Sequence, residues 1–177
     1  MTENPLDPRR KAIEEDYFRK QNAELAAKLK ARTSMQAAGV QDKELADRLL
    51  AAGFTEDSVR ALYLVPVVDV AWADGRISPE EKTEIMKIAE GRGIKRDSAA
   101  FKMVLNWIEA KPTDENYKRA KSLVDPLLEG LGAEGGDWLL AAAQRVAEAT
   151  GGVFGFGVKV THDEKTVLTK LATKLKK

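Results

Sequence analysis

A nearly unbroken apolar stretch, followed at once by a turn and a new helix start, limits the possible folds of this chain more than any other feature. Residues 62–73 are apolar except for Asp69, and Pro66 is the only helix breaker among them. A helix that is apolar on nearly all sides belongs at the centre of a bundle. Asp74-Gly75 then ends this helix, because glycine adopts the left-handed conformation after a helix end without steric cost.

The residues after this turn carry a strong helix-start signal, and that signal occurs a second time. Ser78 is placed to cap a new helix, and Glu81 completes a capping box with it. Near the C-terminus, Thr161 and Glu164 have the same chemistry at the same spacing. We therefore predict two related helix-turn-helix units, at about residues 55–94 and 136–177, that pack as halves of one bundle.

The fold class follows from the absence of strand patterns. No segment of useful length alternates with period two between turn signals, so the sequence predicts an all-α bundle of about seven to eight helices. Residues 1–33 form a charged N-terminal arm, whose helix ends near Arg32, and residues 34–177 form the bundle. Helix starts are expected at the following caps: Asp42, Thr55, and Asp97 or Ser98.

Three further expectations concern helix interruptions. Pro66 should kink or split the helix in which it lies, since proline removes a backbone hydrogen bond and clashes with the preceding turn. Pro126 should interrupt a later helix for the same reason. Residues 130–136, which are rich in glycine, are expected to form a loop.

The N-terminal helix has a thin apolar stripe for its length. The stripe consists of the following side chains: Ile13, Tyr17, Phe18, Leu25 and Leu29. It can pack along its own domain, which is the simpler interpretation, or it can be reserved for a partner or a second copy. In the second case, Tyr17 and Phe18 are the candidate partner-binding residues, and Trp107 joins them as a tryptophan expected at the surface of its helix. Trp72 and Trp138 are expected in the core.

Composition excludes several classes of function. A formal net charge of +1 makes nucleic acid a poor partner, because that binding rests on unbalanced Lys and Arg. The absence of cysteine excludes disulfides, thiolate catalysis and cysteine-based zinc sites. The sequence has no apolar run near the roughly 20 residues of a membrane span and no signal-peptide pattern. We expect a cytoplasmic protein without membrane insertion.

Acidic residues near the two turns suggest a metal site. The residues from Asp74 to Glu81 resemble part of a calcium-binding EF-hand loop, but Val70 and Trp72 occupy two positions that must supply oxygen ligands, so an EF-hand is rejected. A different site remains open if the repeats face each other. Its candidate ligands are Asp69, Asp74, Glu81, Asp163 and Glu164. Such ligands favour calcium, magnesium or manganese. The alternative is that these acids satisfy helix N-termini.

Two other features give weaker signals. The glycine-rich residues 151–157 invite a phosphate-loop interpretation, but no strand precedes them and two phenylalanines favour an extended loop on the core. His162 is the only histidine, and no nucleophile motif accompanies it. No catalytic or cofactor-binding residue is predicted.

Three features occur together in this chain: an apolar helix that ends in Ala71-Trp72-Ala73-Asp74-Gly75, the residues Ile77-Ser78 and Glu81 that follow it, and a second unit that contains Thr161-His162-Asp163-Glu164. This combination resembles the TerB-like family, which is named from bacterial tellurite-resistance proteins. The likeness spans about residues 55–177. It implies a compact helical bundle, acidic residues near the turns that bind metal, and a role in stress response. The sequence thus predicts a non-enzymatic protein-interaction or stress-response module that binds a protein partner or itself, or alternatively a divalent-metal-binding or metal-sensing domain.

Overall fold

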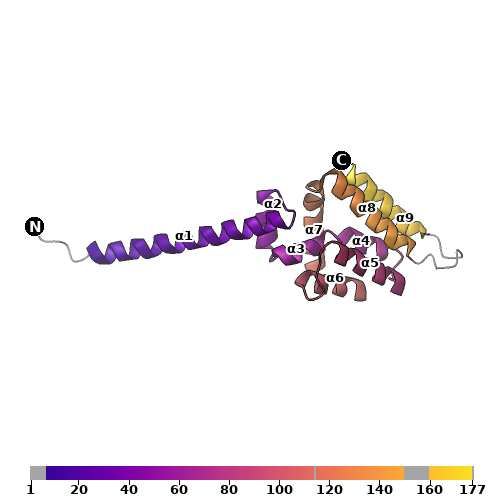
Figure 1. Cartoon of the computed structure of the whole chain (residues 1–177), viewed down its shortest axis with the longest axis horizontal. Coiled ribbons are helices and arrows are strands. Elements are labelled where there is room, and N and C mark those ends of the chain that lie inside the picture. Colours follow the sequence, from indigo (N-terminus) through magenta and orange to yellow (C-terminus); the bar gives the residue numbers. More distant parts are fainter. Residues whose placement is uncertain (1–6, 114, 150–159, 177) are drawn as a thin grey trace, which may run out of the picture.

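The computed structural model describes residues 7–113, 115–149 and 160–176 (Figure 1). Over these residues the chain forms nine helices and no strands, which confirms the all-α class. The helices are α1 (Asp7–Ala37), α2 (Lys43–Ala51), α3 (Glu56–Leu62), α4 (Val65–Ala71), α5 (Pro79–Gly91), α6 (Ala99–Glu109), α7 (Glu115–Glu129), α8 (Gly132–Glu148) and α9 (His162–Leu175). Within these ranges, no helix combines the length and the apolar character needed to cross a membrane.

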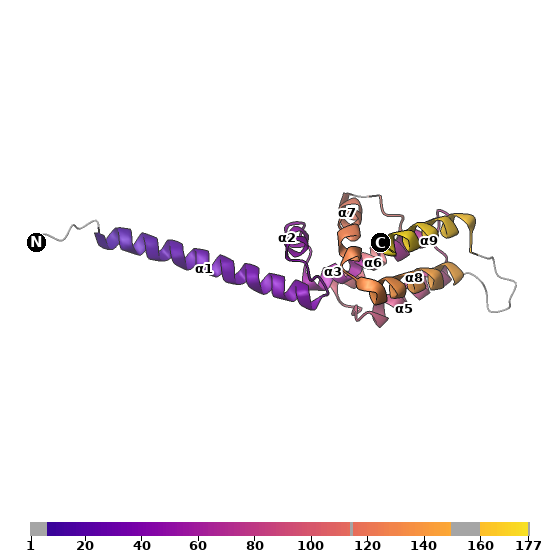
Figure 2. The ribbon, with the colours of Figure 1, turned by 90° about the horizontal axis from the view of Figure 1, so that it is seen from above.

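The long helix α1 projects from the helical body, and within the described ranges it is anchored only at its C-terminal end (Figures 1 and 2). Arg32 Nε donates a hydrogen bond to Asp47 Oδ1 of α2 at 2.6 Å, and Met35 is fully buried. The helix continues to Ala37, beyond the expected end, because the burial of Met35 holds the last turn in place. Gly39, with φ +101°, then reverses the chain.

Local capping signals place most helix starts as expected. Each predicted cap accepts a hydrogen bond from the backbone N–H group three residues ahead, which satisfies a donor that the helix itself cannot pair. Where the sequence left two choices, Ser98 rather than Asp97 caps α6. The complete set is Asp42 for α2, Thr55 for α3, Ser78 for α5, Ser98 for α6 and Thr161 for α9.

The central helix of the body is α4. Pro66 lies in its first turn, and the preceding helix α3 ends at Leu62, so the helix is split near Pro66, as expected. All residues of α4 are buried except Asp69, which is half-buried. It packs against α5, α7, α8 and α9. This position explains why its sequence is apolar on nearly all sides.

Two expected interruptions are wrong. Helix α7 runs through Pro126 without a break, because buried side chains on both sides of the proline, including Val124 and Leu127, hold it against the body. Most of the expected loop at residues 130–136 belongs to α8 instead. Gly136 is buried there, and a Cβ atom on it would lie 3.6 Å from Leu175, so the glycine allows α8 and α9 to pack closely. Helices α8 and α9 lie side by side in both views (Figures 1 and 2).

Candidate functional site

The two helix-start motifs form capping boxes of the same geometry. In the first, Ser78 N donates to Glu81 Oε2 at 2.7 Å, and Glu81 N donates to Ser78 Oγ at 3.2 Å. In the second, Thr161 N donates to Glu164 Oε2 at 2.6 Å, and Glu164 N donates to Thr161 Oγ1 at 3.2 Å. The sequence repeat is therefore also a repeat of local structure, at the starts of α5 and α9.

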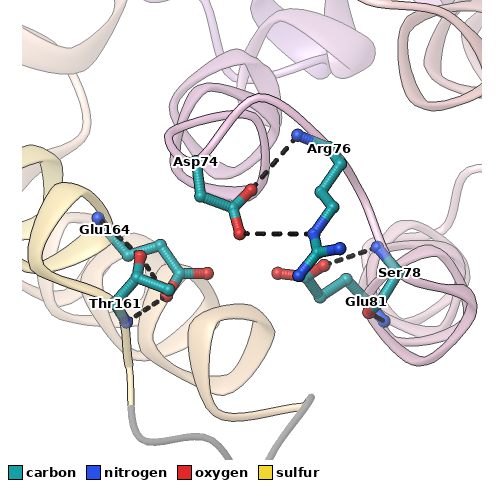
Figure 3. Close-up of polar contacts among 6 residues, drawn as sticks. All are labelled: Asp74, Arg76, Ser78, Glu81, Thr161 and Glu164. Carbon is teal, nitrogen blue, oxygen red and sulfur yellow. Dashed lines mark hydrogen bonds and ion pairs between the residues drawn. The ribbon is translucent and has the colours of Figure 1, made fainter.

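Glu81 and Glu164 face one another across the body. Figure 3 shows their carboxyl groups pointing toward each other, one from α5 and one from α9. Glu81 is 3% exposed and Glu164 is 2% exposed, although both are first-turn residues, which are usually solvated. Two carboxyl groups thus lie together where neither has full contact with water.

This arrangement shifts the protonation of Glu81. Burial raises the pKa of the Glu81 carboxyl, and the neighbouring Glu164 carboxyl raises it further through a hydrogen bond to the protonated form and through its charge. The hydrogen bonds from Ser78 act in the opposite direction, because they favour the ionised form. The net effect is a raised pKa of the Glu81 carboxyl, so the folded protein keeps a proton on Glu81 to a higher pH than the unfolded chain does.

Asp74 lies at the edge of this pair. Its Oδ1 atom accepts a hydrogen bond from Arg76 N at 3.1 Å, and its Oδ2 atom lies 3.9 Å from Arg76 Nε. Figure 3 shows its carboxyl group on the same side as those of Glu81 and Glu164. Gly75, with φ +91°, makes the turn that places it there. Asp74 is exposed, and the nearby guanidinium group of Arg76 offsets its negative charge, in contrast to the two glutamates.

The other predicted metal ligands lie apart from the glutamate pair. Asp69 accepts a hydrogen bond from Tyr117 Oη at 3.0 Å and forms an ion pair with Lys121 Nζ at 2.6 Å. Burial raises the pKa of Tyr117, and the charge of Asp69 raises it further. Asp163 is exposed in the first turn of α9. Among the residues that the structure describes, no group of three or more acidic or histidine side chains is placed to hold a metal ion.

Trp107 is not the surface residue that the sequence suggested. It is 6% exposed, its ring packs edge-on against Tyr117 at a centroid distance of 5.3 Å, and its carbonyl accepts a hydrogen bond from Trp72 Nε1 at 2.8 Å. The prediction of exposure is wrong because it considered only the apolar stripe of α6, whereas α7 covers the adjacent face. Trp72 and Trp138 are partly buried against the core, and Arg92 stacks over the Trp138 ring at 3.5 Å.

The second candidate surface is the apolar stripe of α1. Its five large apolar side chains are between 57% and 70% exposed. The simpler interpretation, in which this stripe packs along its own domain, is therefore wrong. Tyr17 and Phe18 contact each other edge-on at a ring-centroid distance of 5.9 Å, and both are exposed to solvent. The members of the stripe are Ile13, Tyr17, Phe18, Leu25 and Leu29.

Sequence reasoning missed the polar contacts that join distant elements. Arg145 of α8 forms an ion pair with Glu84 of α5, next to the Glu81 turn. The only sequence signal for this contact is the position of Glu84 on its helix, and that position does not identify Arg145 as the partner. His162 is exposed, as expected for a surface residue without a catalytic motif. The glycine-rich residues 151–157, for which the sequence favours an extended loop on the core, lie outside the described residues.

Comparison of the chain with protein-family models, with curated proteins and with solved structures found no match in any of the three. The TerB-like resemblance therefore rests on the pattern of turns and caps in the sequence.

Proposed function

We propose that this protein is a non-enzymatic protein-binding module whose binding element is α1. The observation that carries the proposal is the exposure of the α1 stripe, where five large apolar side chains project into solvent from a helix held only at one end. Covering a large apolar side chain gains about 1.5–3 kcal/mol. Isolated helices are marginal in water without a packed face. A partner that covers the stripe therefore gains binding free energy from the buried apolar side chains, and it also stabilises the helical conformation of α1.

The chemistry of the stripe suits a protein interface. Tyr17 and Phe18 are aromatic, and aromatic residues are enriched in the buried centres of interfaces. Charged pairs surround them, such as Arg10 with Glu14 at 3.2 Å and Lys20 with Asp16 at 2.9 Å. These pairs keep the free helix solvated and can form the polar rim of an interface.

The proposal includes a cytoplasmic stress-response role of the TerB-like kind. The resemblance supports it through the two predicted helix-turn-helix units, in each of which the second helix begins with a capping box that contains a buried glutamate. An enzyme is disfavoured because the sequence lacks cysteine and its single histidine is exposed at a helix start.

Site-specific photocrosslinking tests the binding role. A photoreactive phenylalanine analogue replaces Phe18 in one variant and Ala23, on the opposite side of α1, in a matched control. In cells that make the full chain, we expect discrete protein adducts from position 18 and far fewer from position 23. No adduct at position 18, or the same adducts at both positions, would contradict a binding role for this face.

A second candidate function is divalent-cation binding at Glu81 and Glu164. The specific observation in its favour is that two buried carboxyl groups face each other with Asp74 at their edge (Figure 3). A calcium, magnesium or manganese ion would compete with the proton for these oxygens. Calorimetric titration of the full chain should then give binding heat that Glu81→Gln abolishes and Asp69→Asn keeps. Absence of heat from all three ions in the parent would remove this candidate.

A further inference from the structure

Three helices leave an uncovered groove on the side of the body formed by α4, α7 and α9. The groove has a volume of about 510 Å³. One wall is formed by α7 and the other by α9. In each helix the lining residues have the spacing i, i+3, i+4 and i+7, which begins at Lys121 in α7 and at Val167 in α9. Val65 and Pro66 of α4 contribute to its floor. Such spacing is one complete face of a helix, so both walls offer the surface against which another helix packs.

The groove combines an apolar floor with a positive rim. Four lysines and two aspartates line it, which gives a net charge of +2. Both aspartates are paired within the groove, Asp69 with Lys121 at 2.6 Å and Asp125 with Lys174 at 2.5 Å. In the described part of the chain, Lys111 and Lys170 have no ion-pair partner. The groove is therefore best suited to a helix that has exposed apolar side chains and a net negative charge.

The chain itself carries such a helix. Residues 14–25 of α1 contain four acids and two bases, a net charge of −2, and include the exposed Tyr17, Phe18 and Leu25. From Phe18 to Leu25 the helix rises about 10 Å, and each groove wall spans the same number of residues. The part of the stripe from Phe18 to Leu25 thus matches each groove wall in length and presents exposed apolar side chains, and residues 14–25 carry a net charge opposite to that of the groove.

These two surfaces cannot meet within one molecule. Helix α1 is continuous from Asp7 to Ala37 and points away from the body (Figures 1 and 2). Its C-terminal end is fixed by the Arg32–Asp47 pair and by the buried Met35. The α1 stripe of one copy can reach only the groove of another.

We propose that residues 14–25 of α1 in one copy bind in the groove between α7 and α9 of a second copy. This inference rests on the proposed function, because it names the partner of α1. The two contact surfaces differ, so the interface is heterologous, and successive copies form a head-to-tail chain or a closed ring.

A complementation experiment tests this arrangement by sedimentation. Phe18→Glu breaks the stripe and leaves the groove intact. The double variant Lys111→Glu/Lys170→Glu reverses the charge of two exposed, unpaired groove residues and leaves the stripe intact. The matched control is Lys102→Glu/Lys165→Glu, which makes the same charge change at exposed lysines outside the groove. Circular dichroism checks that every variant keeps the parent's helix content.

We expect the parent to associate with rising concentration and the control to do the same. Phe18→Glu and the groove variant should each associate at least about tenfold more weakly, since each removes one side of the contact. Mixed together, they should form a 1:1 dimer that grows no further, because one intact stripe and one intact groove remain.

Other outcomes overturn the inference. A parent that stays monomeric, or a mixture of the two variants that stays monomeric, would exclude this contact. If Phe18→Glu prevents association but the groove variant does not, α1 helices pair with each other instead. Adducts from position 18 with a different protein, together with a monomeric parent, would refute self-association while the binding role of α1 stands.

Discussion

The carboxyl group of Glu81 at the start of α5 faces that of Glu164 at the start of α9, and both side chains are almost completely buried (Figure 3). Each glutamate closes its own capping box, so the local structure at two helix starts fixes the contact between distant parts of the chain. Two negative charges at this position would repel each other in a poorly solvated environment. The contact is therefore most favourable when one carboxyl group holds a proton or when a cation is shared.

The first prediction concerns the pH dependence of stability. The folded state raises the pKa of Glu81 above its usual value of 4.5, so it binds a proton more tightly than the unfolded chain does. Below the unfolded value this favourable contribution is complete, and it is lost as pH rises through the folded value. Glu81→Gln mimics the protonated form, because its amide can donate to Glu164 and its carbonyl can accept from Ser78.

Thermal unfolding between about pH 5 and pH 7 measures this effect. Relative to Glu81→Gln, the parent should lose stability as the pH rises. The matched variant Glu80→Gln changes an exposed neighbour in the same turn and should keep the parent's profile. Parallel profiles for the parent and Glu81→Gln would show that Glu81 is ionised in the folded protein throughout this range.

The second prediction concerns the anchor of α1. The hydrogen bond from Arg32 lowers the pKa of Asp47 from 3.8 to about 2. A lowered pKa contributes stability that is present above the unfolded value and is lost as the pH falls toward the folded value. Acidification from about pH 5 to about pH 2 should therefore weaken the contact between α1 and α2 in the parent. Asp47→Asn should lack this step, whereas Asp16→Asn, on the projecting part of α1, should retain it in thermal melts followed by circular dichroism.

Local signals in the sequence were sufficient for most of the fold. Ser78 and Thr161 cap helices because their side chains and the glutamates three residues ahead satisfy free backbone N–H groups, a contact that needs no information from elsewhere in the chain. The same reasoning found the split at Pro66. It failed at Pro126 and Gly136, where packing against neighbouring helices outweighs weak local preferences.

The candidate surfaces required tertiary information. Helical spacing could not reveal that α7 covers Trp107 or that Asp69 meets Lys121, because these contacts join elements that are distant in the sequence. The groove depends on three separate helices, so no single stretch signals it. The sequence did identify Tyr17 and Phe18 as candidates, but only the projecting position of α1 shows that they do not pack on their own domain.

The third prediction compares a leucine of the core with a leucine of the exposed α1 stripe by making the same substitution at each. Leu64 is fully buried beside α4, and Leu64→Ala should lower the free energy of unfolding by about 2–5 kcal/mol. Leu25 is exposed on the α1 stripe, and Leu25→Ala should change it by less than about 0.5 kcal/mol. Denaturant unfolding of dilute protein measures both. A large loss for Leu25→Ala would mean that α1 already packs on its own body.

The last prediction tests the turn between the apolar helix and the first capping box. Gly75 has φ +91°, and a Cβ atom added to it would meet no atom within 4 Å among the described residues beyond its chain neighbours, so Gly75→Ala introduces backbone strain rather than a clash. We expect it to lower the free energy of unfolding by about 1 kcal/mol, since the left-handed region is unfavourable for alanine. Gly91 ends α5 with open space around it and no positive φ, so Gly91→Ala should instead stabilise the protein by about 0.4–1 kcal/mol. Equal effects of the two substitutions in denaturant unfolding would show that the turn does not require a left-handed residue. The chain could then place Asp74 and Glu81 beside Glu164 without glycine at this position.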